Sequence, residues 1–141
     1  MKHELNIWVV GGDLRQAKLA QLLAEDGHTV HTYALGEPQE PVPDLTVETT
    51  LRRVDKADCV VLPLTISAGN GLLNAPLSLL EHPLAPILDQ LVPHQFLCGG
   101  RVDQSVYAMA KERGLVIYDY FAREELAVAN AVPTALAVGH R

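Results

Sequence analysis

The chain has 141 residues, of which 48% are hydrophobic and 20% are charged, and its formal net charge is −6. This length and composition predict one globular domain. The negative charge, without a run of Lys and Arg, argues against nucleic-acid binding, and no apolar segment is long enough to be a membrane span or a signal peptide. Cys59 and Cys98 lie in apolar runs without metal-site spacing, and the six histidines form no ligand cluster. We therefore expect a reduced, cytoplasmic protein that binds no metal.

The chain opens with a strand-like run at Leu5–Val10, which two glycines follow. A helix is expected from Leu14 to Asp26, because small and apolar residues recur there at helical spacing and Gly27 follows as a C-terminal cap. The next apolar run, Thr29–Ala34, reads as a second strand. Two strands around one helix within about thirty residues make a βαβ unit, which requires a parallel sheet.

Strands and helices continue to alternate along the rest of the chain. Pro63 is expected to end the third strand, since proline lacks the N–H that a central strand needs. Expected later strands are Ala57–Leu62, Gln95–Cys98 and Leu115–Tyr118, and expected helices are Leu84–Leu91, a helix capped by Asp103 and ended by Gly114, and Arg123–Val132. This pattern predicts an α/β fold: a flavodoxin-like, doubly wound, five-stranded parallel sheet of order 2-1-3-4-5 in a three-layer αβα arrangement.

Ligands of such folds bind at the carboxyl ends of the strands, where the strand order reverses. In this chain the loops at that place are Gly11–Arg15 and Pro63–Asn74. A dinucleotide-binding turn needs Gly-x-Gly-x-x-Gly, but the third and sixth positions from Gly11 are Asp13 and Gln16. A carboxylate at a helix N-terminus occupies its free N–H groups and repels phosphate. No dinucleotide site is expected here, and Asp13 is either only an N-cap or also part of a site for another ligand.

The loop after the third strand offers hydroxyl, amide and backbone donors that suit carboxylate oxygens, or else it is only a polar glycine turn. Gly99 and Gly100 are expected to form a tight turn beside Arg101, which either contacts a carboxylate or stays solvated. The candidate substrate-binding residues are Gly12, Asp13, Arg15, Thr65, Ser67, Gly69, Asn70, Gly71, Gly100, Arg101 and Asn130. No catalytic acid, base or nucleophile stands out, so the domain reads as a binder.

Other flavodoxin-like functions lack their motifs. A response-regulator receiver needs an Asp after the third strand and a Lys after the fifth, and a flavodoxin needs a Ser/Thr-rich phosphate loop after the first. A cobalamin module needs Asp-x-His-x-x-Gly. The sequence contains none of these patterns at the required places.

Three segments together resemble one family. Val9–Gln16, Leu62–Gly71 and Arg123–Thr134 are similar, in the same order, to the N-terminal domain of the A subunit of dipicolinate synthase. The resemblance implies a role in dipicolinic acid synthesis during endospore formation, by NADP-dependent oxidation of a dihydrodipicolinate-type precursor. It also implies a small dicarboxylate substrate and, as the partner, a second, flavoprotein-like subunit, and it leaves homo-oligomerisation open.

In that family a Rossmann domain with the Gly-x-Gly-x-x-Gly turn follows, whereas this chain stops at Arg141 before such a turn. Residues 1–141 are therefore expected to form the substrate-side domain alone, with NADP bound elsewhere in the full enzyme. The chain also departs from the family pattern at Ala135–Val138. The alternative hypothesis is a non-enzymatic flavodoxin-like binding or assembly module. A strand and a glycine fingerprint within about forty residues beyond Arg141 would favour the first hypothesis.

Overall fold

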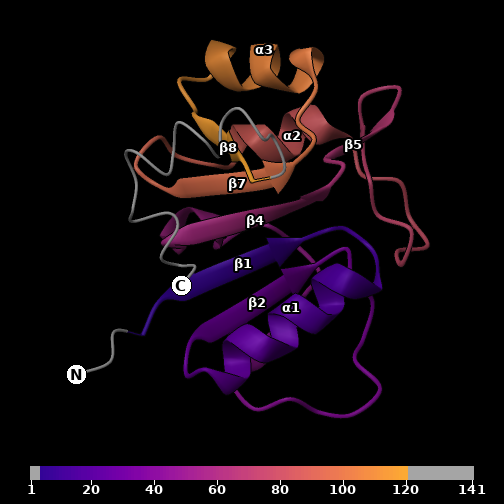
Figure 1. Cartoon of the computed structure of the whole chain (residues 1–141), viewed down its shortest axis with the longest axis vertical. Coiled ribbons are helices and arrows are strands. Elements are labelled where there is room, and N and C mark those ends of the chain that lie inside the picture. The colour runs from indigo at the N-terminus through magenta and orange to yellow at the C-terminus, as the bar shows by residue number, and fades with distance from the viewer. Residues whose placement is uncertain (1–3, 121–141) are drawn as a thin grey trace.

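The computed structural model describes residues 4–120 and contains one main sheet. Its six strands all pair in parallel, in the order β3-β2-β1-β4-β7-β8, and Figure 1 shows the arrows of β1, β2 and β7 pointing the same way. The bounds are β1 Asn6–Val10, β2 Thr29–Tyr33, β3 Leu45–Glu48, β4 Cys59–Leu64, β7 Phe96–Gly100 and β8 Ile117–Asp119. The α/β class and the parallel sheet are confirmed.

The expected five strands and their order are wrong, because the sheet has a sixth strand at its edge. β3 follows a proline-rich loop and has only four residues, so its alternation of Leu45 and Val47 with polar residues was too short to stand out. Pairing makes it a strand: Val30 to Tyr33 of β2 align with Leu45 to Glu48. An edge strand needs partners on one side only, so a weak local pattern is sufficient there.

The prediction that Pro63 ends the third strand is also wrong, because β4 continues to Leu64. Pairing with β1 extends only to Val61, and the register with β7 shifts between Val61 and Leu64. Proline is tolerated where a bulge or a free edge demands no N–H at that position.

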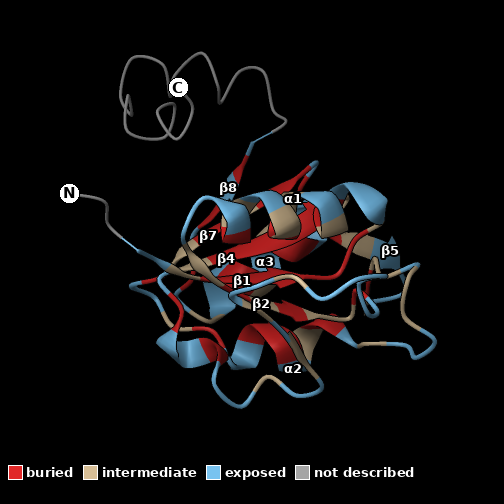
Figure 2. Ribbon diagram, turned by 90° about the horizontal axis from the view of Figure 1, so that it is seen from below, coloured by how far each residue is buried: buried red, intermediate tan, exposed pale blue. Residues whose placement is uncertain are grey.

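Helices lie on both faces of the sheet (Figure 2). α1 (Leu14–Glu25) packs on one face against β1, β2 and β3, while α2 (Leu84–Asp89) and α3 (Gln104–Glu112) lie on the other. Alternate residues of β1 supply the two cores: Ile7 and Val9 face α1, and Trp8 and Val10 face the core that α2 and α3 complete. This alternation is the period-two pattern of a strand buried on both faces.

The helix caps agree with the sequence analysis. The side chain of Asp13 accepts the Arg15 N–H at the start of α1, and that of Asp103 accepts the Val106 N–H at the start of α3. Gly27 and Gly114 follow these helices with φ of 99° and 72°. A short 3-10 helix, η1 (Val54–Lys56), precedes β4. The expected helix Arg123–Val132 lies outside the described residues.

A small antiparallel hairpin, β5 (Ser67–Gly69) with β6 (Leu72–Leu73), extends beyond the carboxyl end of the sheet (Figure 1). Asn70 and Gly71 connect the two strands with φ of 55° and 72°. Two consecutive positive φ values define a type I′ turn, for which Asn-Gly is a favoured pair. The loop that the sequence analysis interpreted as a binding loop or a polar glycine turn therefore contains a hairpin, and Asn70-Gly71 was the signal that could have revealed it.

Candidate functional site

The two loops expected at the switch point do meet there. Gly11 and Gly12, directly after β1, have φ of 71° and 102°, a region that favours glycine. The Gly12 N–H donates to the carbonyl of Asn74 over 2.8 Å, and a Cβ on Gly11 would lie 3.0 Å from that same oxygen. The turn after β1 therefore closes directly on the chain that leaves β6.

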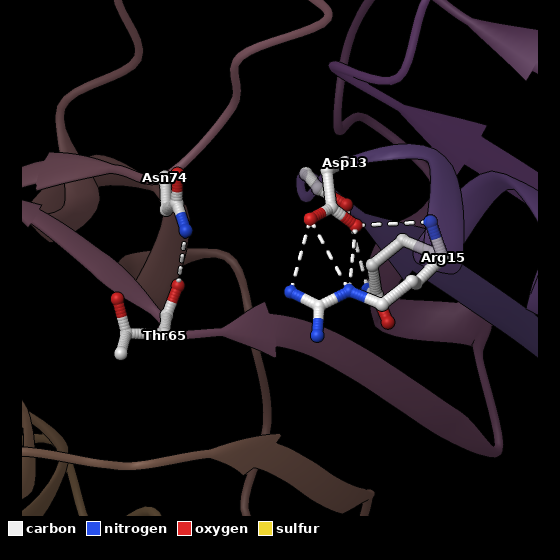
Figure 3. A network of polar contacts seen from close by, with 6 residues as sticks. Asp13, Arg15, Thr65 and Asn74 are labelled. Carbon is white, nitrogen blue, oxygen red and sulfur yellow. Dashed lines mark hydrogen bonds and ion pairs between the residues drawn. The ribbon is translucent and has the colours of Figure 1, made fainter.

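Asn74 links three segments of this site. Besides accepting from Gly12, it donates its backbone N–H to the Ile66 carbonyl over 2.9 Å. Its side-chain Nδ2 donates to the Thr65 carbonyl over 2.9 Å, as Figure 3 shows. Asn74 thus joins the turn after β1 to the loop after β4. The sequence analysis did not single it out, because an Asn in a polar loop carries no local signal of a long-range contact.

Asp13 and Arg15 form an ion pair at the start of α1 (Figure 3). Arg15 donates through Nε to both carboxylate oxygens over 3.2 Å and through Nη2 to Oδ2 over 3.0 Å. The hydrogen bonds and charge of Arg15 lower the pKa of the Asp13 carboxyl. Both side chains remain accessible to solvent. The pair leaves Nη1 of Arg15 without an acceptor in the described part of the chain.

Gln16 is buried beneath this turn, and its role was not predicted. Its Nε2 lies 3.4 Å from the carbonyls of Gly11 and Val61, at the seam between β1 and β4. A Cβ on Gly12 would lie 2.1 Å from Gln16 Cγ. The absence of a side chain at Gly12 is therefore required for Gln16 to pack there, whether or not a ligand approaches this glycine.

Most predicted donors of the loop after β4 have partners within the loop. The Thr65 hydroxyl donates to the Ser67 carbonyl over 3.0 Å, and the Ser67 hydroxyl accepts the Gly69 N–H over 3.0 Å. Asn70 and Gly71 occupy the exposed turn of the hairpin. Hairpin geometry alone therefore explains Gly69, Asn70 and Gly71, and their contact with a substrate stays a prediction.

The expected turn at Gly99 and Gly100 is wrong, because both residues belong to β7. They are needed for close packing: a Cβ on Gly99 would lie 2.6 Å from Ile66 Cδ1, and one on Gly100 would lie 2.7 Å from Leu64 Cδ1. The segment 64–66 therefore lies across the carboxyl end of β7. This contact adds a third strand end to the site.

The turn after β7 begins at Arg101, whose φ is 52°. Asp119, buried at the end of β8, holds this turn: its carboxylate accepts the Arg101 N–H over 3.0 Å and the Val102 N–H over 2.7 Å. The Arg101 side chain is exposed at the same strand ends. The sequence analysis missed the role of Asp119, although an acidic residue that ends a buried strand could have indicated it.

Tyr120 follows Asp119 and borders the Asp13–Arg15 pair. Burial is the main reason that the pKa of its hydroxyl is raised, and the charge of Arg15 partly offsets this shift. Tyr120 is therefore a protonated phenol at the rim of the site. Asn130, the remaining predicted site residue, lies outside the described residues.

The geometry thus brings together Gly12, Asp13, Arg15, Thr65, Gly100 and Arg101 at the carboxyl ends of β1, β4 and β7. Within residues 4–120, no group of three or more His, Cys, Asp and Glu side chains could hold a metal ion. Nor does this part of the chain contain a helix long and apolar enough to cross a membrane.

A family model described as the N-terminal domain of the dipicolinate synthase A subunit matches residues 6–121. The chain belongs to this family. The fold agrees with crystal structures of two relatives. Dipicolinate synthase, A chain, from Bacillus subtilis aligns with a TM-score of 0.75 and 22% identity over 100% of this chain and 50% of that one. The dipicolinate synthase A subunit from Bacillus halodurans aligns with a TM-score of 0.69 and 20% identity, over 97% of this chain and 49% of that one. The chain therefore spans about half the length of these relatives, and a comparison with curated proteins found no match.

Proposed function

We propose that this domain forms the substrate side of the A subunit of a dipicolinate synthase, which oxidises a dihydrodipicolinate-type precursor to dipicolinic acid during endospore formation. In such a reaction the substrate would lose a hydride and a proton and become aromatic, and NADP⁺ would supply the hydride acceptor. Membership of the N-terminal domain family is the observation that carries the proposal. The reaction would take place in the cytoplasm, in an enzyme that also contains a flavoprotein-like second subunit.

The charges at the strand ends support a dicarboxylate ligand. The Asp13 carboxylate accepts hydrogen bonds from Nε and Nη2 of Arg15, so Nη1 can donate to another acceptor. Arg101 supplies a second positive charge at the end of β7. A dicarboxylate could use both cations, with the phenol of Tyr120 and the exposed amide of Asn70 as neutral donors. Hydrogen bonds to charged groups are worth about 1.5–3 kcal/mol each, enough to orient a small substrate.

The turn after β1 does not fit NADP. A phosphate would need the N–H groups there, but the Gly12 N–H already donates to Asn74 and the Asp13 carboxylate stands at the start of α1. We therefore place NADP on a separate domain of the full-length enzyme, across a cleft from these loops. The residues of this chain would bind and orient the substrate against it.

The experiment is steady-state kinetics of the full-length enzyme with its partner subunit. R15A should raise KM for the dihydrodipicolinate-type substrate about 10- to 100-fold, from the loss of one charged hydrogen bond. K18A removes an exposed cation one turn along α1 and should change KM less than twofold. S67A and N70A test the hairpin in the same assay against R53A, which alters an exposed arginine outside the site. Equal KM values for all five variants and the wild type would contradict the proposed substrate site.

A further inference from the structure

A pocket of about 530 Å³ lies beside α2, at the carboxyl ends of the edge strand β3 and its neighbour β2. Tyr33 and Thr49 line it from these strand ends, Arg52 from the following loop, and His82 and Ile87 from the region of α2. None of the predicted substrate-binding residues lines it. Its volume is in the range of pockets that hold small molecules.

Three polar side chains line the pocket without a hydrogen-bonding partner among the described residues: Thr49 and Arg52 are exposed, and Tyr33 is half-buried. Across residues 4–120, no hydrogen bond or ion pair joins the hydroxyls of Tyr33 and Thr49 or the guanidinium of Arg52 to another group. The Arg52 backbone N–H donates to Thr50 Oγ1 over 3.4 Å, which holds the loop in place. Hydroxyl and guanidinium donors that converge on one pocket suit an oxyanion.

His82 is held in place by a neighbouring serine. Ser78 Oγ lies 2.7 Å from His82 Nε2 and also accepts the Leu80 N–H over 3.2 Å. Ser78 therefore engages Nε2 of the His82 ring. Burial lowers the pKa of His82, so the ring is neutral at neutral pH. The edge-on contact with Tyr33, with ring centroids 5.3 Å apart, fixes its orientation.

The remaining wall is apolar. Leu51, Pro83, Pro86 and Ile87 supply it, so an apolar ring can pack against it. Glu81 also lines the pocket. Arg52 is the one cation among the lining residues, so it can pair with a single carboxylate, and a second negative charge on the ligand would add repulsion from Glu81.

We propose that this pocket binds an aromatic monocarboxylate, with the ring on the proline-rich wall and the carboxylate on Arg52 and the hydroxyls of Tyr33 and Thr49. This site is separate from the substrate site proposed above. The two are connected, because the Leu73 N–H donates to the His82 carbonyl and the Leu84 N–H donates to the Gly71 carbonyl, each over 2.8 Å. A ligand in the pocket therefore abuts the segment that supports the β5–β6 hairpin.

The test is a titration of the ¹⁵N-labelled 141-residue chain with benzoate, followed by amide chemical shifts. Benzoate should shift and saturate the resonances of Tyr33, residues 49–52 and His82. Acetate, which lacks the ring, and benzyl alcohol, which lacks the charge, should each bind at least fivefold more weakly. R52A should weaken benzoate binding about tenfold, while R53A, which alters an adjacent arginine that does not line the pocket, should leave it unchanged.

Shifts centred elsewhere, no saturable shifts, or equal affinities of R52A and R53A would overturn the proposal. The unliganded spectra of both variants show whether either has lost its fold, and Y33F then provides a second variant that removes only one hydroxyl. A parallel titration with pyridine-2,6-dicarboxylate, read at residues 12–15 and 65–74, tests the proposed substrate site. The two titrations report on different residues, so either proposal can fail without the other.

Discussion

The side chain of Asn74 should hold the candidate site together, and its replacement measures how strongly. N74A removes one part-buried hydrogen bond of 2.9 Å to the Thr65 carbonyl and leaves both backbone hydrogen bonds of residue 74 in place. A neutral bond of this kind is worth about 1 kcal/mol of unfolding free energy. N74D loses the same bond and also sets a carboxylate against a carbonyl oxygen, so its cost should be about 2–3 kcal/mol.

Urea denaturation provides the assay, because Trp8 is the only tryptophan of the chain and is 1% exposed, so its fluorescence reports unfolding. With a slope of about 2 kcal/mol per molar urea, the urea midpoint should fall by about 0.5 M in N74A and by about 1–1.5 M in N74D. Q104A, which changes an exposed amide without a described partner, is the control and should lie within about 0.2 M of the wild type.

The pH dependence of stability separates the loss of the hydrogen bond from the repulsion between the carboxylate of N74D and the Thr65 carbonyl. A protonated carboxyl can donate to the Thr65 carbonyl, whereas a carboxylate cannot, so the deficit of N74D relative to N74A should shrink as the pH falls toward 4. If N74A equals the wild type, or if N74D is no worse than N74A at pH 7, the side chain of Asn74 does not link the two loops as described.

Three further predictions concern other parts of the domain. D119A should lower the unfolding free energy by about 3 kcal/mol, because one buried and one part-buried backbone N–H group lose a charged acceptor, and D119N should recover part of this loss. A urea midpoint of D119A close to that of the wild type would contradict the role of Asp119. The pKa of His82 is below its ordinary value of 6.5, so the unfolded chain takes up the proton first as the pH falls through about 6.5, and stability falls with it. The wild type should therefore lose more stability than H82Q between pH 7.5 and 5.5, and equal losses in urea would refute this. Calorimetric titration of the 141-residue chain with NADP should give a Kd weaker than roughly 100 μM, and tighter binding would show that Asp13 and the occupied Gly12 N–H do not exclude the cofactor.

Local patterns predicted the elements that carry strong local signals. The apolar run of β1, the caps at Asp13 and Asp103 and the glycines that follow α1 and α3 each have a cause within a few residues of sequence. Parallel pairing also followed, because a strand–helix–strand unit leaves no other geometry. These features placed the candidate loops at the correct edge of the sheet.

Long-range contacts decided the rest. β3 is a strand because β2 offers it an edge, and Gly99 and Gly100 are glycines because residues 64 and 66 lie against them. Asn74 and Asp119 hold loops by hydrogen bonds to other segments of the chain, and such contacts produce no periodic pattern in the sequence from which they could be predicted. The sequence by itself thus determined the fold class, the family resemblance and the edge of the sheet where the candidate loops lie. Only the tertiary structure decided the sixth strand, the contacts that close the glycine turn and the pocket beside α2, because each depends on which segments the sheet brings side by side.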